Sequence, residues 1–131
     1  MPLLLDTHAL LWFIGGDNQL SAQARKLIED PSNRVMVSTI SLVEMTIKIK
    51  LNKLSLKKPL NEIYRDIRSA FIEVLPISPS HLIEYQNVPL YAEHRDPFDR
   101  LIIATAVVEK PEVISLDPKF QYYKDLVDIR W

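Results

Sequence analysis

The 131-residue chain has no cysteine and only two glycines, and these shortages exclude several kinds of functional site. Without cysteine there is no disulfide framework, no thiolate metal site and no cysteine nucleophile. The glycines are the adjacent pair Gly15 and Gly16, so the chain has no glycine-rich loop of the kind that binds phosphate groups. A chain without cysteine is compatible with a reducing compartment, and we expect the protein in the cytoplasm.

The chain also lacks long apolar segments. No apolar run approaches the roughly 18 residues that a membrane-spanning helix needs. The segment from Met1 to Asp6 has neither the basic flank nor the long apolar stretch of a signal peptide. We therefore expect no membrane partner.

A surplus of basic residues is missing as well, because the formal net charge is −1. Proteins that bind nucleic acid usually carry such a surplus, so the composition speaks against a nucleic-acid partner. Metal cations that neutralise carboxylates, or a local basic patch, would overcome this objection. The candidates for a patch, which a solvated helix face would explain equally well, are Lys48, Lys50, Lys53, Lys57 and Lys58.

Short apolar runs alternate with segments of helical periodicity. Strands are predicted at residues 2–6, 34–38, 74–77, 113–116 and 127–129, and helices at residues 7–12, 21–30, 39–51, 59–71, 80–87 and 96–109. The strand at 74–77 contains Pro76 and is expected at a sheet edge. This alternation predicts an α/β fold, a three-layer α/β/α sandwich with a central, mainly parallel sheet. The length predicts a single domain over residues 1–131.

Two aspartates directly follow predicted strands. Asp6 ends the first strand and Asp117 follows Ser115-Leu116 at the end of a later one. Because parallel sheets bind ligands at the carboxyl ends of their strands, we expect both side chains at one edge of the sheet. Capping of the following helix explains Asp6 equally well, and a turn at Asp117-Pro118 explains Asp117.

Glu44 lies in the helix predicted at residues 39–51. The apolar stripe of this helix, which we expect to face the core, consists of Ile40, Val43, Ile47 and Leu51. Glu44 is next to that stripe, and a buried carboxylate without a partner costs several kcal/mol, so it favours a nearby cation. The alternative is an exposed pair with Lys48 one turn later, which stabilises a helix by only about 0.3–0.5 kcal/mol.

Asp96-Pro97-Phe98-Asp99 is typical of a helix start, with Asp96 as the N-cap and Pro97 at the first helical position. The helix dipole favours an acid such as Asp99 in the first turn by about 0.3–1 kcal/mol. The apolar run at residues 101–104 indicates a buried helix, however, whose first turn would point the Asp99 charge into the fold.

Together these acids form a donor set made only of oxygen. Hard cations such as Mg²⁺ and Mn²⁺ prefer that set, and they support hydrolysis of phosphodiester bonds. Because clustered like charges repel, at least one of the carboxyl groups should have a raised pKa without metal. We predict metal ligands at Asp6, Glu44, Asp99 and Asp117, with Asp96 in second place.

Several segments, in this order along the chain, resemble proteins of the PIN-domain family, and most closely the bacterial toxin ribonucleases of VapC type. They are LLLDTHALLW at residues 3–12, Ser41-x-x-Glu44-x-x-x-Lys48, HRDPFDRLIIA at residues 94–104, and Ser115-Leu116-Asp117 followed by Phe120 and Tyr123. The resemblance implies a compact α/β/α fold, Mg²⁺- or Mn²⁺-dependent endoribonuclease activity on RNA, a small antitoxin partner and a homodimer.

Carried over by position, Asp6, Glu44 and Asp99 match the family's three metal-binding acids, and Asp117 matches its more variable fourth acid. Pro118 directly after Asp117 departs from the family pattern and puts the orientation of that fourth acid in doubt. Contact with the substrate is a weaker expectation for four further residues, which are Ser115, His94, Arg95 and Arg100.

Two other functions remain open. One is a PIN-like scaffold that binds protein without turnover. The other is a receiver-like signalling domain, which would need an acidic pair near the first strand and an aspartate after a middle strand. Neither feature is present, since Thr7-His8 follows Asp6 and Ser38-Thr39 follows the second strand.

Overall fold

The computed structural model describes every residue from Met1 to Trp131. Five short strands form one sheet in the order β3-β2-β1-β4-β5, and every neighbouring pair is parallel. The strands are β1 (Pro2–Leu5), β2 (Arg34–Ser38), β3 (Glu73–Leu75), β4 (Glu112–Ile114) and β5 (Asp128–Arg130). The predicted parallel α/β fold is thereby confirmed. The order differs from the 2-1-3-4-5 order of receiver-like domains, which removes that alternative.

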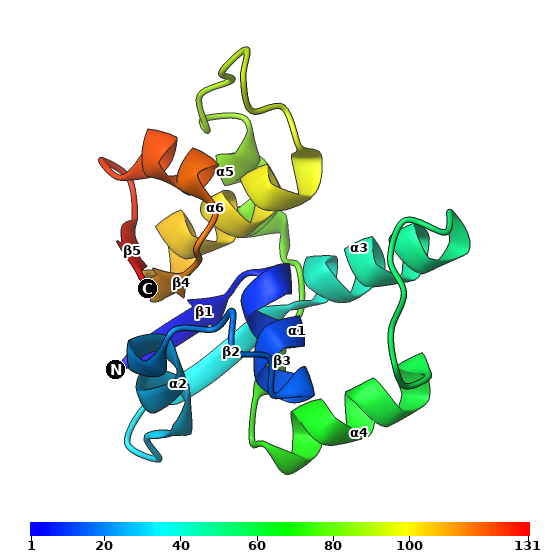
Figure 1. The fold of residues 1–131 in the computed structure, drawn as a ribbon. Helices are drawn as coiled ribbons and strands as arrows, with labels where there is room; N and C mark the ends of the chain where they lie inside the picture. Colours follow the sequence, from blue (N-terminus) through cyan, green and yellow to red (C-terminus); the bar gives the residue numbers. More distant parts are fainter.

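Helices cover both faces of this sheet (Figure 1). Residues of β1 point alternately to the two sides: Leu3 and Leu5 enter a core with α1, α2 and α4, whereas Leu4 enters a core with α6 and η1. The helices are α1 (Thr7–Gly15), α2 (Ala22–Glu29), α3 (Thr39–Lys50), α4 (Leu60–Ser69), α5 (Pro79–Tyr85), α6 (Pro97–Glu109) and the 3₁₀ helix η1 (Pro118–Tyr123). None of them is long and apolar enough to cross a membrane.

The register of the three central strands sets the position of the site. Leu5 at the end of β1 pairs with Val37 of β2 and with Ile114 of β4. The residues that follow these three positions are therefore neighbours at one edge of the sheet, which we call the carboxyl edge. They are Asp6, Ser38 and Ser115, and all three are buried.

The predicted core face of α3 is wrong. Val43 and Ile47 are each 41% exposed and Leu51 is 56% exposed, so these three residues face outward, whereas Ile40 packs against the core. The buried positions are Ser41, Glu44 and Met45. α3 begins at the end of β2 and extends away from the sheet (Figure 1), and the polar residues on its buried face are Ser41 and Glu44.

Other predicted boundaries differ in small ways. Phe71 does not continue the stripe of α4 but lies beyond its end, 91% exposed and with a left-handed φ of 59°. Pro59 is the N-cap of α4 and not its first helical residue. The strand β3 does lie at an edge of the sheet, as predicted, and ends just before Pro76.

Candidate functional site

Asp6 stands at the centre of the carboxyl edge and is only 5% exposed. Its carboxylate accepts a hydrogen bond from the backbone N–H of Ala9 (2.8 Å), which caps α1, and another from the hydroxyl of Ser115 (2.6 Å). Ser115 is within reach because it follows Ile114, the β4 partner of Leu5. Asp6 is therefore both a helix cap and a buried carboxylate at the carboxyl edge, and the two placements predicted from the sequence do not exclude each other.

Asp99 lies in the first turn of α6, after the cap formed by Asp96. Asp96 accepts from the backbone N–H groups of Phe98 (2.8 Å) and Asp99 (3.2 Å), which confirms its predicted capping role. His94 Nε2 lies 3.1 Å from Asp99 Oδ2, and His94 Nδ1 lies 2.7 Å from the hydroxyl of Tyr123. A neutral ring satisfies both contacts if Tyr123 donates to Nδ1 and Nε2–H donates to Asp99. One side of the Asp99 carboxylate is thus fixed, while Oδ1 accepts no hydrogen bond from the protein.

Glu44 projects from the buried face of α3 and is 3% exposed. Thr7 donates to its Oε1 (2.7 Å) and also lies 3.0 Å from the hydroxyl of Ser41. Lys48 donates to its Oε2 (2.6 Å). The pair of Glu44 with Lys48 therefore exists, but it is buried on the glutamate side and not the exposed pair that we had considered.

Asp117 is half-buried and begins η1, where its Oδ1 accepts from the backbone N–H of Lys119 (2.9 Å). Its own N–H donates to Ser115 (3.2 Å), which links it to the Asp6 side of the site. Asp117 thus has the turn-forming contact, and its second oxygen is available for other partners.

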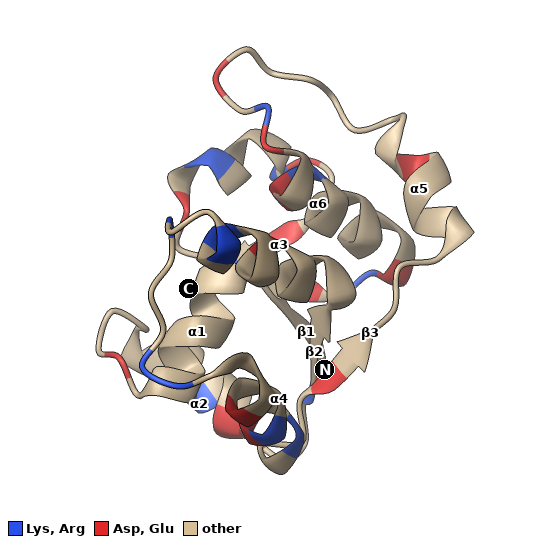
Figure 2. Cartoon of the chain, turned by 90° about the vertical axis from the view of Figure 1, so that its right-hand side faces the viewer, with Lys and Arg blue, Asp and Glu red and all other residues tan.

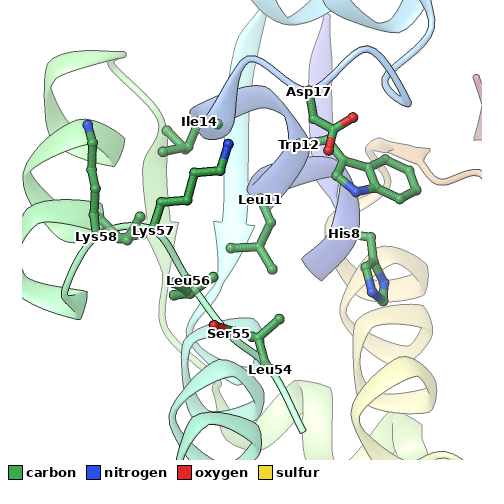
Figure 3. A pocket seen from close by; sticks show the side chains of 12 residues that line it. His8, Leu11, Trp12, Ile14, Asp17, Leu54, Ser55, Leu56, Lys57 and Lys58 are labelled. Atoms are coloured by element: carbon green, nitrogen blue, oxygen red, sulfur yellow. The ribbon is translucent and has the colours of Figure 1, made fainter.

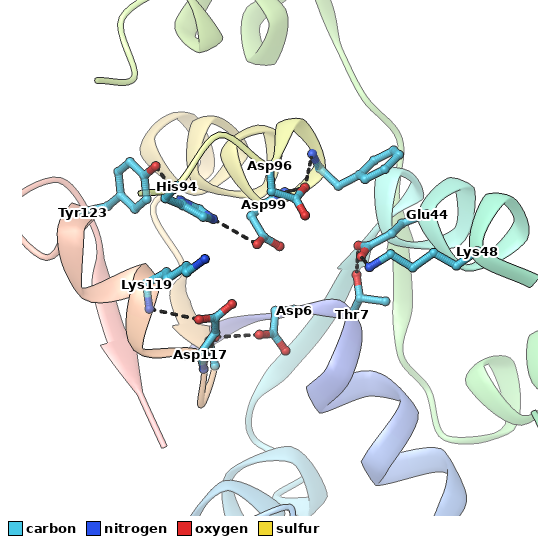
Figure 4. Close-up of polar contacts among 12 residues, drawn as sticks. Asp6, Thr7, Glu44, Lys48, His94, Asp96, Asp99, Asp117, Lys119 and Tyr123 are labelled. Carbon is cyan, nitrogen blue, oxygen red and sulfur yellow. Dashed lines mark hydrogen bonds and ion pairs between the residues drawn. The ribbon is translucent and has the colours of Figure 1, made fainter. Parts of the chain in front are cut away.

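Figure 4 shows how the acidic side chains are arranged. Asp6, Asp99 and Asp117 point toward a common space at the carboxyl edge, whereas Glu44 lies to one side with Thr7 and Lys48. No three of the acidic or histidine side chains are close enough together to hold a metal ion in this arrangement. An ion would therefore need small side-chain movements, or water molecules to complete its coordination.

Burial leaves two of these carboxyl groups with raised pKa values. Desolvation raises the pKa of Asp6, against the lowering effects of Ser115 and Ala9. Desolvation also raises the pKa of Asp99 to about 7, with further contributions from the charges of Asp96 and Glu44, although the bond from His94 lowers it. The direction of the pKa shift agrees with the sequence-based prediction, but its main cause is desolvation and not repulsion between the acids. Such a donor set, made of oxygen and rich in uncompensated negative charge, fits a hard divalent cation.

Three of the four residues predicted to contact substrate are otherwise engaged. His94 is 2% exposed and both its ring nitrogens have partners within the protein. Arg100 is 7% exposed and donates to the hydroxyl of Tyr85 and the carbonyl of Val88. Ser115 is 3% exposed and donates to Asp6. These placements leave none of the three free to bind a phosphate group, and only Arg95 is exposed.

The predicted lysine track is partly neutralised. Lys48 pairs with Glu44, and Lys58 pairs with Asp66 at 2.9 Å. From the side shown in Figure 2, basic and acidic segments are interspersed, with no continuous basic stripe. Lys50, Lys53 and Lys57 form no ion pair, so only part of the track is neutralised.

Residues that hold the acids in place were not identified from the sequence. Thr7 and Tyr123 were noted only as part of the resemblance, and their contacts join segments 37 and 29 residues apart. A hydroxyl directly after Asp6 was a weak signal for Thr7. Nothing in the local pattern pointed to Tyr123.

A groove of about 410 Å³ lies beside the acids, between α1 and the segment that leads into α4 (Figure 3). Its walls include Leu11, Trp12, Leu54 and Leu56, and its rim carries polar groups such as Lys57. This groove is a mainly apolar surface next to a charged one.

Comparisons with known proteins agree with this fold. The sequence model of the PIN domain matches residues 3–126. The chain is similar in structure to VapBC2 from Rickettsia felis bound to a promoter DNA fragment, with 19% identity, a TM-score of 0.71 and coverage of 100% of this chain and 99% of that one. It is also similar to DNA-bound VapBC from Salmonella typhimurium (18% identity, TM-score 0.68, coverage 99% and 97%). A third similar structure is VapBC-1 from nontypeable Haemophilus influenzae, with 19% identity, a TM-score of 0.64 and coverage of 99% of this chain and 97% of that one. No curated protein matches the chain in sequence.

The raised pKa of Asp99 predicts a pH-dependent stability of the metal-free protein. Between the ordinary pKa of 3.8 and the folded value of about 7, the folded state holds a proton that the unfolded chain has released. The stability that the Asp99 carboxyl group contributes is therefore fully present below the ordinary pKa of 3.8, and it is lost as the pH rises through the folded pKa of about 7. In EDTA, Asp99→Asn should melt at a higher temperature than the wild type at about pH 8, and the two curves should converge near about pH 4. A difference that did not vary with pH, or an equal effect of the exposed control Asp125→Asn, would contradict this.

Proposed function

The chain belongs to the PIN-domain family, and on this basis we propose that it is a single-domain, divalent-metal-dependent endoribonuclease. We propose further that it is the toxin of a toxin–antitoxin pair, that it acts in the cytoplasm, and that RNA is its substrate. The observation that carries the proposal is the pair of Asp6, which is buried, and Asp99, whose side chain is 18% exposed; their carboxylates face a common space from two different elements (Figure 4).

Each of these two carboxylates is held in place and still able to bind a cation. Asp6 is oriented by Ala9 and Ser115, and Asp99 is oriented by His94, while Asp99 Oδ1 remains free. A carboxylate oxygen has two lone pairs, so a single hydrogen bond does not block coordination. Asp117 is the natural third ligand, because one of its oxygens has no partner and its backbone is tied to Ser115.

The chemistry follows from this arrangement. When bound, Mg²⁺ or Mn²⁺ would polarise a phosphodiester and lower the pKa of a water molecule. The chain contributes two rigidly held carboxylates that bind and orient, and His94 and Tyr123 keep one of them from rotating. Arg95, exposed and directly before the cap of α6, is placed to contact a phosphate of the substrate.

The scaffold without turnover remains a second candidate, and one observation favours it. The charge of Glu44 is already balanced by Lys48, and Thr7 donates to its other oxygen, so one of the four predicted ligands is neutralised within the chain. If Lys48 and Thr7 never released Glu44, the protein would keep its fold, but the charge of Glu44 would stay balanced by Lys48 rather than by a metal ion. Cleavage assays separate the two functions.

We expect Asp6→Asn and Asp99→Asn each to abolish Mn²⁺-dependent cleavage of RNA, lowering the rate by about 10³-fold or more, because removal of a metal ligand removes the stabilisation of developing charge. The fold should persist, since an asparagine keeps the size of the side chain and most of its hydrogen bonds. The measurement is cleavage of labelled RNA with and without Mn²⁺, beside the control Asp125→Asn. Full activity in both site variants would refute the assignment, and no activity in the wild type would favour the scaffold.

A small antitoxin is the partner that we propose, in keeping with the toxin–antitoxin complexes among the similar structures. The apolar groove between α1 and α4 is the surface that we propose for it (Figure 3). Apolar side chains of a partner would gain about 25 cal/mol per Å² of apolar area buried there. Because the groove adjoins Asp6 through His8, a bound segment would also limit access to the acids.

Expression of the protein should arrest bacterial growth, and the product of the adjacent gene should relieve the arrest. Leu56→Asp places a charge on the groove wall and should abolish relief while RNA cleavage continues. The matched control is Leu126→Asp, which changes an exposed leucine far from the groove and should leave relief intact. Relief that persisted in Leu56→Asp would exclude the groove as the binding surface.

The outward stripe of α3 suits a contact between two copies of the chain. Val43, Ile47 and Leu51 repeat at helical spacing and are all exposed, so they form a continuous apolar strip. We propose that this strip forms part of the homodimer interface.

Sedimentation should find the wild type as a dimer and Ile47→Glu as a monomer or a much weaker dimer, because the substitution buries an unpaired charge in the interface. Leu126→Glu, at a comparably exposed leucine elsewhere, should remain dimeric. A monomeric wild type, or a dimer insensitive to Ile47→Glu, would show that the strip has another use.

A further inference from the structure

A pocket smaller than the groove of Figure 3 opens directly beside the acids of the carboxyl edge. Its volume is about 270 Å³, and its lining residues are Asp6, His8, Trp12, Leu116, Asp117 and Pro118. Two of them are acids of the proposed metal site, and the others bring an indole, an imidazole and aliphatic groups. Sites for drug-sized ligands have roughly 300–1,000 Å³, so this pocket suits a group about the size of one ring system.

The aromatic part of the pocket comes from α1, where His8 and Trp12 lie one turn apart on the same face. Their ring centroids are 5.6 Å apart with 41° between the ring planes, and Trp131 meets Trp12 edge-on at 5.7 Å and 71°. Neither neighbour is parallel to the indole, as a stacked ring would be. Figure 3 shows Trp12 and His8 at the end of the groove away from Lys58. The indole is therefore supported on two sides and still only partly buried.

The aliphatic part of the pocket comes from the segment between β4 and η1. Leu116 is 49% exposed, although it lies between Ser115 and Asp117, which both belong to the site. Pro118, the first residue of η1, is also exposed. The pocket thus combines an aromatic surface from one element with an aliphatic surface from another. Proteins hold an unpaired nucleobase between aromatic and apolar side chains in this way.

The two acids indicate which occupant the pocket suits. Under the proposed function, the phosphate at which RNA is cut lies beside Asp6 and Asp99. Because Asp6 and Asp117 also line the pocket, the base of a nucleotide that flanks this phosphate is within reach of it. An apolar side chain of a protein partner would leave these carboxylates without a counterpart, whereas a nucleotide brings the phosphate with its base.

We propose that this pocket is a nucleobase subsite, in which one base next to the cleaved phosphodiester bond stacks on Trp12. This inference rests on the proposed function and makes its substrate more specific. A base that is paired within a duplex can enter the pocket only at the cost of unpairing and unstacking. The RNA that this protein cuts is therefore unpaired at one of the two nucleotides that flank the cleaved bond.

The first test combines a change in the protein with a change in the RNA. In a labelled RNA with a mapped cleavage site, each nucleotide that flanks the cleaved bond is replaced in turn by an abasic one. For the wild type, one of the two replacements should lower kcat/KM about tenfold, mainly through KM, as expected for the loss of one stacked base. Trp12→Leu should cause a similar loss on the intact RNA and no further loss on the abasic RNA.

Three further variants separate stacking from a structural role. Trp12→Phe keeps a ring and should recover most of the activity, together with the sensitivity to the abasic nucleotide. Leu116→Ala trims the other side of the pocket and should also raise KM, which keeps the test valid if Trp12→Leu does not fold. Phe71→Leu removes an exposed aromatic ring beyond the end of α4 and should leave kcat/KM unchanged on both RNAs.

A binding measurement tests the pocket independently of cleavage. Adenosine and cytidine, which have a base but no charged phosphate, are titrated in EDTA into the isotope-labelled full-length protein. The chain has two tryptophans, so Trp131→Phe assigns the indole N–H signal of Trp12 in the magnetic resonance spectrum. At least one nucleoside should shift that signal in a saturable manner, and ribose should not. A Trp12 signal that stayed in place, or moved equally with ribose, would overturn the inference.

Other outcomes distinguish this inference from the proposed function. An equal loss on the abasic RNA in the wild type and in Trp12→Leu would overturn the subsite while the nuclease proposal stands. Normal cleavage by Trp12→Leu, with growth arrest no longer relieved by the adjacent gene product, would assign the pocket to the protein partner instead. A wild type that cleaved no RNA would refute the proposed function, and the nucleoside titration would then decide whether the pocket binds a base.

Discussion

The cost of removing carboxylates from water is the constraint on which the carboxyl edge depends. Asp6, Asp99 and Glu44 are removed from water at the end of a parallel sheet, where ionised groups are costly unless they are paired. Almost every polar contact in the region offsets part of that cost. Ser115 and a backbone N–H hold Asp6, His94 holds Asp99, and Thr7 with Lys48 hold Glu44.

These contacts divide the acids into two groups. Glu44 has a full positive charge against it, and its burial is balanced within the chain. Asp6 and Asp99 have hydrogen bonds but no lysine or arginine, and the cost remains as raised pKa values. Negative charge without a counter-ion is what a cation site requires before the ion arrives. The division explains why we assign the ion to Asp6 and Asp99, although the sequence ranks Glu44 beside them.

Much of the fold follows from the sequence, because apolar runs and caps are local signals. Three residues of β1 are fully buried, and Ser21 and Asp96 cap helices as their residue types predict. The outer face of α3 could not be predicted, because periodicity shows that a helix has an apolar stripe but not what covers it. Glu44 was expected beside the core stripe, yet it lies on the buried face itself, whereas Ile47 is exposed. The hydrogen-bond partners of the acids could not be predicted either. Thr7 and Tyr123 contact residues that are far away in the sequence and that only the folded arrangement brings close.

The overall charge of −1 speaks against a nucleic-acid substrate, and the ion pairs of Lys48 and Lys58 leave that objection in place. Net charge describes attraction at long range, and salt screens it beyond roughly 8–10 Å. Lys48 and Lys58 are already paired with acids and contribute little to attraction at a distance. A divalent ion held by Asp6 and Asp99 would instead place positive charge where a phosphate must lie, beside the exposed Arg95. Under the proposed function, a chain of this composition would need a bound ion to attract a polyanion, and metal binding would then be a condition for substrate binding as well as for chemistry.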